Sequence, residues 1–233
     1  LFQPFYPPAP AETARQQFES SYPFHPAVLS LFERKWQALP RFQQTRGVLR
    51  LLALWVAKAY NDGFKKLTKD ALITLGTAPL EDPNFRAAVF EQLGENRLEA
   101  AVTTDIAGKH ESWAGRLDLE AIDAIKKSRL HKKCATTIFF ESNGGQTAQG
   151  LATLPEIKLS VGDPDLDIGL VDGVIQSLLD SCYYLTAVNN KFKYSIHENL
   201  IKRFSDRRAS IQPPAINELV ETFDDHFSEE LNK

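Results

Sequence analysis

The stretch from Val48 to Val56 is apolar at every position except one, and that exception is Arg50. A helix whose sides are nearly all apolar is expected to lie in the protein interior. A buried guanidinium needs an anion beside it, because an unpaired charge in apolar surroundings is very costly. The sequence therefore predicts a buried helix over residues 48–60, in which Arg50 meets either a carboxylate or a ligand.

The composition is that of an ordinary globular protein, with 43% hydrophobic and 24% charged residues in a chain of 233. This length supports one large or two small hydrophobic cores. The net charge of −3 gives no global indication of nucleic acid or an anionic membrane as a partner. No membrane-spanning run and no signal-peptide pattern is found. Cys134 and Cys182 lack metal-ligand spacing and are typical of buried thiols in a cytoplasmic protein.

The first half of the chain is predicted to be helical. Residues 1–21 are interpreted as a connector from a missing upstream domain, because the first ten are rich in proline. Within 22–125, helices are expected after Pro26, over 48–60 and from Asp82-Pro83 to Gly94. A further, charged helix is expected over 117–130. His25 lies at a helix start, where a capping or packing role is expected, and no two histidines have the spacing of a metal site.

The second half has a different pattern, and residues 126–210 are predicted to be a separate domain. A short helix over 154–161 is followed by a long one that Asp163-Pro-Asp165 caps. Two short β-type runs then flank Asn189-Asn190, which is a β-hairpin signal. Helices followed by a hairpin are the order of a winged-helix domain. A closing helix over 198–209 leads to an acidic, amphipathic tail, 211–233.

Several motifs resemble a bacterial family catalogued as domain of unknown function 499. The most specific is Phe42-Gln-Gln-Thr-Arg-Gly-Val-Leu-Arg50-Leu-Leu-Ala, which follows Tyr22-Pro-Phe-His-Pro26 by about a dozen residues. The weaker ones are Asp105-Ile-Ala-Gly, Arg116-Leu-Asp, Ser142-Asn-Gly-Gly, Cys182-Tyr-Tyr-Leu and Phe204-Ser-Asp-Arg. Members of this family look like large AAA+ ATPases, some encoded near phage-defence systems. The resemblance implies that this chain follows the ATPase core and forms a helical lid and a winged helix.

The same resemblance implies a role for Arg50. Gly47-Val-Leu-Arg50 is similar to the sensor-two motif of AAA+ lids, in which a glycine precedes the lid helix and an arginine reaches the γ-phosphate of ATP. Arginine offers a rigid fork of donors to phosphate oxygens, and Gly47 would let the backbone turn sharply. Arg46 is the neighbouring competitor and is expected to pair locally or face solvent. No Gly-x-x-x-x-Gly-Lys-[Ser/Thr] motif exists. Thr136–Glu141 superficially imitates a Walker B strand but lacks the aspartate that would hold Mg²⁺.

A basic cluster at 126–133 is the alternative site. Its cations, with two in the predicted hairpin, could contact DNA phosphates or form a solvated surface. These residues are Lys126, Lys127, Arg129, Lys132, Lys133, Lys191 and Lys193. The helix that would enter a major groove argues against base reading, since 163–180 contains five aspartates and neither lysine nor arginine.

The sequence is therefore interpreted as the mainly α lid and winged-helix segment of a cytoplasmic bacterial AAA+-like ATPase. The segment alone is not expected to hydrolyse ATP. ATP and Mg²⁺ would be held by the parent protein and sensed through Arg50. The upstream core is the expected partner, with DNA, a protein partner and oligomerisation left open and a membrane excluded. The alternatives are a DNA-binding winged-helix adaptor and a purely structural interaction domain.

Overall fold

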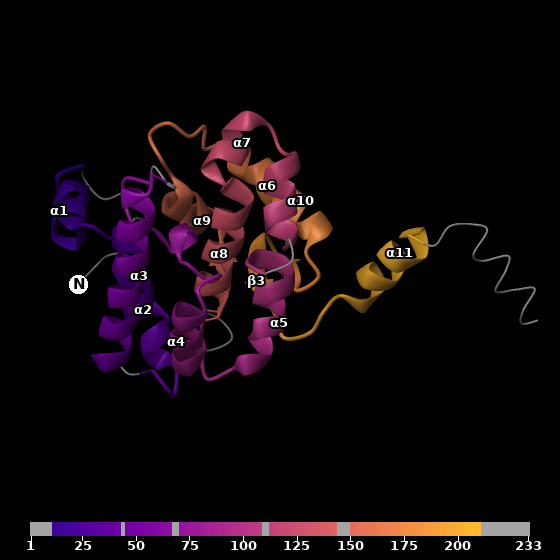
Figure 1. The fold of residues 1–233 in the computed structure, drawn as a ribbon, viewed down its shortest axis with the longest axis horizontal. Coiled ribbons are helices and arrows are strands. Elements are labelled where there is room, and N and C mark those ends of the chain that lie inside the picture. The colour runs from indigo at the N-terminus through magenta and orange to yellow at the C-terminus, as the bar shows by residue number, and fades with distance from the viewer. Residues whose placement is uncertain (1–10, 43–44, 67–69, 109–111, 144–149, 211–233) are drawn as a thin grey trace, which may run out of the picture. The chain divides into compact units, whose positions relative to one another are not determined.

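The computed structural model describes residues 11–42, 45–66, 70–108, 112–143 and 150–210. Over these residues the protein is mainly helical, with one small three-stranded antiparallel sheet (Figure 1). Residues up to Glu198 form one compact unit, and residues from Asn199 onward form a second. The predicted mainly α class with a small hairpin is confirmed. The proline-rich segment 1–10 and the tail 211–233 lie outside the described residues.

Four helices come from the first part of the chain: α1 (Ala11–Ser21), α2 (Pro26–Arg34), α3 (Arg46–Phe64) and α4 (Pro83–Leu93). Prolines begin α2 and α4, where the missing N–H removes no helical hydrogen bond. The Asp82 carboxylate caps α4 by accepting hydrogen bonds from the N–H groups of Asn84 and Phe85, at 2.9 and 3.0 Å. Gly94 ends α4 in a left-handed conformation, with φ of 69°. The predicted bounds of this helix are confirmed.

The next segment is more broken than the sequence pattern predicts. It contains η3 (Asn96–Leu98), α5 (Glu99–Ala101), the π-helical turn η4 (Val102–Ile106), α6 (Trp113–Glu120) and α7 (Asp123–Ser128). The prediction of one helix over 117–130 is wrong. The Asp118 carboxylate, on α6, accepts hydrogen bonds from the backbone N–H groups of His131 and Lys132, at 2.9 and 3.1 Å. Because it caps the following helix, the chain must turn between them, and Arg129 adopts a left-handed φ of 52°.

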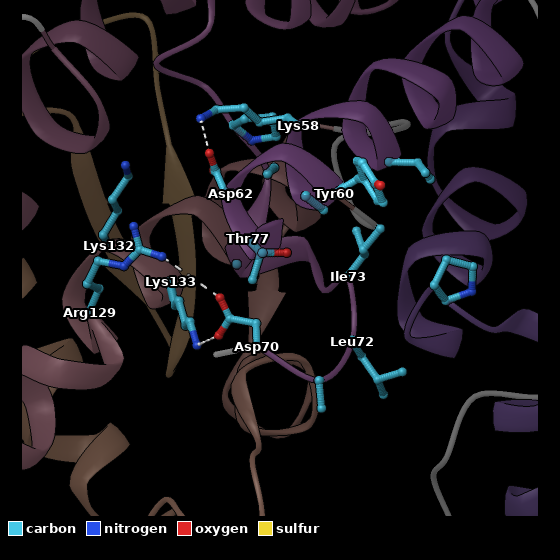
Figure 2. A pocket seen from close by; sticks show the side chains of 18 of the residues that line it. Lys58, Tyr60, Asp62, Asp70, Leu72, Ile73, Thr77, Arg129, Lys132 and Lys133 are labelled. Atoms are coloured by element: carbon cyan, nitrogen blue, oxygen red, sulfur yellow. Dashed lines mark hydrogen bonds and ion pairs between the residues drawn. The ribbon is translucent and has the colours of Figure 1, made fainter. Parts of the chain in front are cut away.

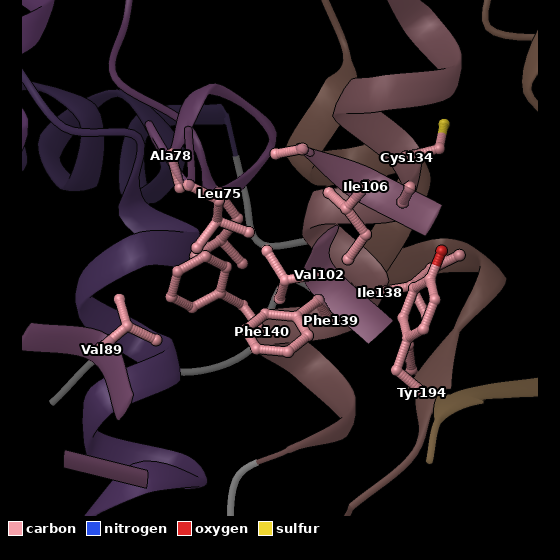
Figure 3. Close-up of a cluster of buried hydrophobic side chains, with 14 of the residues drawn as sticks. Leu75, Ala78, Val89, Val102, Ile106, Cys134, Ile138, Phe139, Phe140 and Tyr194 are labelled. Carbon is pink, nitrogen blue, oxygen red and sulfur yellow. The ribbon is translucent and has the colours of Figure 1, made fainter. Parts of the chain in front are cut away.

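Helix α8 (Leu130–Ser142) is the centre of the first unit (Figure 1). It contacts η2 (Leu75–Thr77) and α6 and, from later in the chain, α9 (Leu154–Val161), α10 (Leu170–Ser181) and strand β3 (Lys191–Tyr194). Its apolar side chains point in several directions and include Cys134, Ile138, Phe139 and Phe140, which meet residues from other elements in Figure 3. A helix that is apolar on all sides belongs in the interior, and α8 meets that rule. The run 136–141, whose sequence imitates a Walker B strand, is part of this helix.

The sheet is built from β1 (Ala152–Thr153), β2 (Leu185–Val188) and β3 (Lys191–Tyr194), in the order β1-β3-β2. Asn189 and Asn190 connect β2 to β3 with φ of 51° and 57°, as a two-residue type I′ turn requires. The predicted hairpin is therefore confirmed.

Two helices lie between β1 and β2. Helix α9 (Leu154–Val161) has the predicted bounds, and α10 spans Leu170–Ser181. The prediction that 163–165 caps α10 is wrong. Asp163 and Asp167 instead accept hydrogen bonds from the N–H groups two residues on, at 3.0 and 2.9 Å. Aspartates that bond their own backbone in this way favour turns over helix.

One hydrophobic core runs through residues 24–194. Trp36, in η1 (Trp36–Ala38), and Trp55, on α3, both stack on Phe140, with ring centroids 5.5 and 5.7 Å apart. Two of the weaker sequence motifs also meet here. The buried Asp105 accepts hydrogen bonds from the N–H groups of Tyr183 and Tyr184, at 3.1 and 2.8 Å. The predicted domain boundary at 125/126 stays a prediction, and α8 contributes to the core on both sides of it.

Helix α11 (Leu200–Ser210) belongs to the second unit and corresponds to the predicted closing helix. Its side chains are largely exposed, including Leu200, Ile201 and Phe204.

Candidate functional site

Helix α3 leaves half of its apolar side chains exposed, so the prediction of a helix buried on nearly all sides is wrong. Four others, Val48, Leu52, Leu54 and Ala59, are partly buried against the core. Only Gly47, Leu51 and Trp55 are buried, and they form one narrow stripe four residues apart. The opposite side carries Leu49, Val56, Tyr60 and Phe64, whose exposed fractions are 61%, 37%, 71% and 79%. We call these four residues the α3 apolar stripe. Their spacing of seven, four and four residues places them on one face of the helix. The helix is as apolar as the sequence predicts, but part of its apolar surface faces outward instead of into the core.

Arg50 is exposed and lies beside this stripe. Its Nη1 lies 2.8 Å from Oε2 of Glu91 on α4, and the two side chains are 56% and 52% exposed. The carboxylate that the sequence required therefore exists, but the pair is not buried. Exposed ion pairs contribute about 0.2–1 kcal/mol, because water solvates both charges well. Arg50 is thus held only weakly and remains accessible to another anion.

Gly47 has a packing role that differs from the predicted one. It is the second residue of α3, so the prediction that it precedes the helix is wrong. A Cβ atom at Gly47 would lie 2.4 Å from Oε1 of the buried Gln92, on α4. The glycine therefore lets α3 and α4 approach closely at the end where Arg50 meets Glu91. Arg46, the first residue of α3, is exposed as expected.

The structure divides the basic cluster between two places. Lys126 and Lys127 are exposed on α7, where Lys127 pairs with Asp123 at 3.3 Å and the Nζ of Lys126 donates to the carbonyl of Leu119 at 3.0 Å. The other three cations, Arg129, Lys132 and Lys133, line a pocket of about 450 Å³ between α3, α8 and the segment 70–81. We call it the Arg129 pocket. These five residues are neighbours in the sequence. The chain turns at Arg129, between α7 and α8, so Lys126 and Lys127 lie apart from the other three.

Carboxylates accompany the cations of the Arg129 pocket (Figure 2). Lys133 Nζ lies 2.5 Å from Oδ1 of Asp70, and a guanidinium nitrogen of Arg129 lies 3.8 Å from Oδ2 of the same carboxylate. Lys132 pairs with Glu81 at 3.1 Å, and Lys58 pairs with Asp62 at 2.6 Å. These pairs compete with DNA phosphates for the same cations.

The two hairpin lysines are placed apart from this pocket. Lys191 is exposed at the start of β3, and Lys193 is half-buried within it, opposite Thr186. Lys191 lines a second cavity, of about 860 Å³, together with residues of α2 and α9. The outer face of α10 carries Asp172 and Asp180, and Asp172 pairs with Lys158 on α9 at 2.7 Å. The acidic character predicted for this helix therefore lies on its exposed side.

A buried charge network borders the second cavity, and sequence reasoning missed it. Lys35 Nζ lies 2.6 Å from Oε2 of Glu141 and 3.2 Å from Oε1 of Glu156. It also donates to the carbonyls of Glu141 and Leu151, at 3.1 and 3.2 Å. Burial raises the pKa of Glu141, although the nearby Lys35 opposes that rise. The network joins α2 to the end of α8 and the start of β1. In the sequence this network is visible only as a charged residue, Lys35 or Glu141, at the end of an apolar segment.

His25 caps α2, as its position predicted. Its Nδ1 accepts a hydrogen bond from the N–H of Ala27 at 3.1 Å, and the ring packs edge-on against Phe18 with centroids 5.0 Å apart. Burial lowers the pKa of His25 to about 4, so the ring is neutral at pH 7. A neutral imidazole nitrogen can accept this hydrogen bond, whereas a protonated one cannot.

Comparison with known proteins provides no relative. No family model, no curated protein and no solved structure matches the chain. Within the described residues, none of the helices combines the length and hydropathy that a bilayer crossing needs. Those residues also contain no group of three or more His, Cys, Asp or Glu side chains arranged to hold a metal ion.

Proposed function

We propose that this chain is the lid and winged-helix segment of a bacterial AAA+-like ATPase, and that it senses ATP through Arg50. The observation that carries the proposal is the position of Arg50 beside the exposed α3 apolar stripe. Apolar side chains gathered on one exposed face mark a surface that another protein covers. The partner is the upstream ATPase core, whose bound ATP and Mg²⁺ bring a γ-phosphate that Arg50 can contact.

The Arg50–Glu91 pair supports a switch between two anions. In the absence of the core, Glu91 accepts a hydrogen bond from Arg50 at 2.8 Å. When a γ-phosphate approaches, the guanidinium can exchange this exposed carboxylate for phosphate oxygens, with which it forms stronger bidentate hydrogen bonds. The positive charge then offsets charge that develops during phosphoryl transfer. Gly47 keeps α4, and therefore Glu91, close to the start of α3.

The order of elements in the second half supports the winged-helix part of the proposal. The chain runs α8, β1, α9, α10, β2, β3, and the sheet has the order β1-β3-β2. In a winged helix used for DNA reading, the helix before the hairpin enters the major groove. Here that helix exposes aspartates, which phosphates repel. We therefore assign the hairpin and α10 to contacts with protein rather than with bases.

Non-specific DNA contact is a second, weaker proposal for the exposed Lys126 and Lys127. Both lie on α7 and are engaged only with local partners. Duplex affinity that falls steeply with salt, and that is lost in the Lys126→Ala/Lys127→Ala variant, would support it. Affinity that survives the substitution would exclude these two lysines.

The test of ATP sensing is turnover by the parent protein that contains both the core and this segment. We expect Arg50→Ala to lower ATP turnover by about tenfold or more, because removal of one charge stabiliser costs that much in related chemistry. Arg97→Ala is the matched control, since Arg97 also pairs with a glutamate, Glu95, at 2.7 Å, but belongs to η3 rather than to α3. Equal turnover in both variants, with folding intact, would refute the sensor role.

A further inference from the structure

The Arg129 pocket has the properties of a ligand site, and its lining includes Val56 and Tyr60 of the α3 apolar stripe but not Arg50. Lys58, which lines it, follows Arg50 by eight residues along α3, about 12 Å of helix. Four cationic side chains and three carboxylates line the pocket, so its lining carries a net charge of +1. Its volume of about 450 Å³ falls within the range of small-molecule sites, about 300–1,000 Å³.

Arg129 is the residue that indicates a ligand. Its backbone is left-handed, with φ of 52° and ψ of 48°, a conformation that non-glycine residues rarely adopt. The interaction with Asp70 at 3.8 Å is too long for a hydrogen bond, and the guanidinium has no hydrogen-bond acceptor among the described residues. The left-handed backbone is explained by the end of α7, where Arg129 is the C-cap, so the indication of a ligand is the unused guanidinium donors beside the pocket. The donors of a guanidinium match the oxygens of a phosphate group.

The side of the pocket away from Arg129 indicates which chemical group the ligand carries besides its phosphate. Figure 2 shows Arg129, Lys132 and Lys133 on one side and Tyr60 and Ile73 on the other. Apolar residues also line the cavity, including Val56, Leu72 and Pro79. The Tyr60 ring is 71% exposed and stacks with the Phe64 ring at a centroid distance of 6.4 Å, and such an exposed aromatic ring can contact a flat group. A ligand with a phosphate at one end and a flat apolar group at the other fits both sides.

We propose that the Arg129 pocket binds a small phosphate monoester that bears a flat, apolar group, such as a mononucleotide. Arg129 and Lys132 bind the phosphate, and Tyr60 contacts the flat group. The carboxylate of Asp70, which already lies near both Arg129 and Lys133, occupies part of the position that the phosphate takes. This inference does not depend on ATP sensing by Arg50, because the phosphate contacts come from Arg129 and Lys132; Val56 and Tyr60 are the residues that the pocket shares with the α3 apolar stripe.

The test is calorimetric titration of the 233-residue chain with AMP, pyrophosphate and a short single-stranded oligonucleotide. We expect AMP to bind with a Kd on the order of 1 mM or lower. Arg129→Asn should weaken AMP binding by about tenfold or more, because it removes the charge, and asparagine tolerates the left-handed backbone. Lys127→Ala is the control, since Lys127 pairs with Asp123 outside the pocket.

Two further variants separate a ligand site from a structural cluster. Asp70→Asn removes the competing carboxylate and should strengthen AMP binding several-fold. Tyr60→Ala should weaken AMP binding and leave pyrophosphate binding unchanged. A purely structural Arg129 would produce neither effect. The proposal is overturned if AMP does not bind, if Arg129→Asn binds it normally, or if the oligonucleotide binds more tightly than AMP through Arg129.

Discussion

Helices α3 and α8 have similarly apolar sequences and opposite surroundings. Helix α8 buries eleven of its 13 residues, whereas α3 buries three of its 19. The ion pairs at the two helices differ in the same way, because Glu141 on α8 meets Lys35 in the interior and Arg50 on α3 meets Glu91 in water. An apolar sequence thus predicts that a helix is covered, but it does not show whether the same chain or another protein covers it. We infer that the chain itself covers α8 and that a partner covers α3.

The first prediction compares one phenylalanine from each helix. Phe139 is fully buried on α8, and Phe64 is 79% exposed on α3. We expect Phe139→Ala to lower the free energy of unfolding by about 3–5 kcal/mol, through lost burial and the cavity that it leaves. Phe64→Ala should change it by less than about 0.5 kcal/mol. Urea denaturation of both variants measures the difference. Similar losses would mean that α3 is packed against its own chain.

The second prediction compares the two ion pairs. Lys35→Ala leaves the buried carboxyl group of Glu141 without its principal partner, which costs about 3–5 kcal/mol of unfolding free energy. Arg50→Ala removes an exposed pair and should cost less than about 1 kcal/mol. The double variant Lys35→Met/Glu141→Gln controls for the buried charge and should recover part of the loss. If Lys35→Ala costs no more than Arg50→Ala, the buried network does not contribute as described.

The third prediction concerns pH and the His25 cap, which orients α2 against the core. The native pKa of His25 is about 4, below the value of 6.5 expected when the chain is unfolded. The unfolded chain therefore binds a proton first, so stability is complete above pH 6.5 and falls as the pH drops toward 4. The full loss is about 3 kcal/mol. Chemical denaturation at several pH values measures it, and His25→Asn should flatten this dependence. His197→Asn, at an exposed position, should not.

The smallest predicted effect is a difference in stability between alanine substitutions at the two glycines of α3. Gly47→Ala places a Cβ atom 2.4 Å from the Gln92 amide, which must move within the core, and overpacking of this kind costs about 1–3 kcal/mol. Gly63→Ala meets no atom within 4 Å and should raise stability by up to about 1 kcal/mol, since alanine favours helix. Thermal and urea unfolding of both variants would reveal the opposite signs. Destabilisation by Gly63→Ala would show that this end of α3 is packed.

Local signals in the sequence predicted much of the fold. Asp82-Pro83 and Gly94 gave the bounds of α4, and Asn189-Asn190 gave the hairpin, because caps and turns depend on neighbouring residues. The break in the helix predicted over 117–130 could not be read in this way. It depends on Asp118, whose carboxylate bonds a helix that begins twelve residues later. A hydrogen bond between residues far apart in the chain produces no repeating sequence pattern from which it could be predicted.

The candidate site was harder to predict for the same reason. Arg50 was identified as unusual, but its exposure depends on which face of α3 meets the core. The basic cluster 126–133 was visible as charge, whereas Asp70 and Glu81, which pair with three of its members, come from distant positions. Lys35 and Glu141 are 106 residues apart, so their network was missed.

The most direct test of the central claim is whether α3 is covered in the parent protein. Leu49→Cys and Leu119→Cys place a thiol at two positions that are 61% and 56% exposed here, and only the first lies on α3. Maleimide labelling of the parent protein, followed by mass spectrometry of the two peptides, compares their accessibility with and without ATP. We predict that Cys at position 49 reacts about tenfold more slowly than Cys at position 119, and more slowly still when ATP is bound. Equal rates at both positions, unchanged by ATP, would contradict the assignment of α3 as the surface that meets the ATPase core.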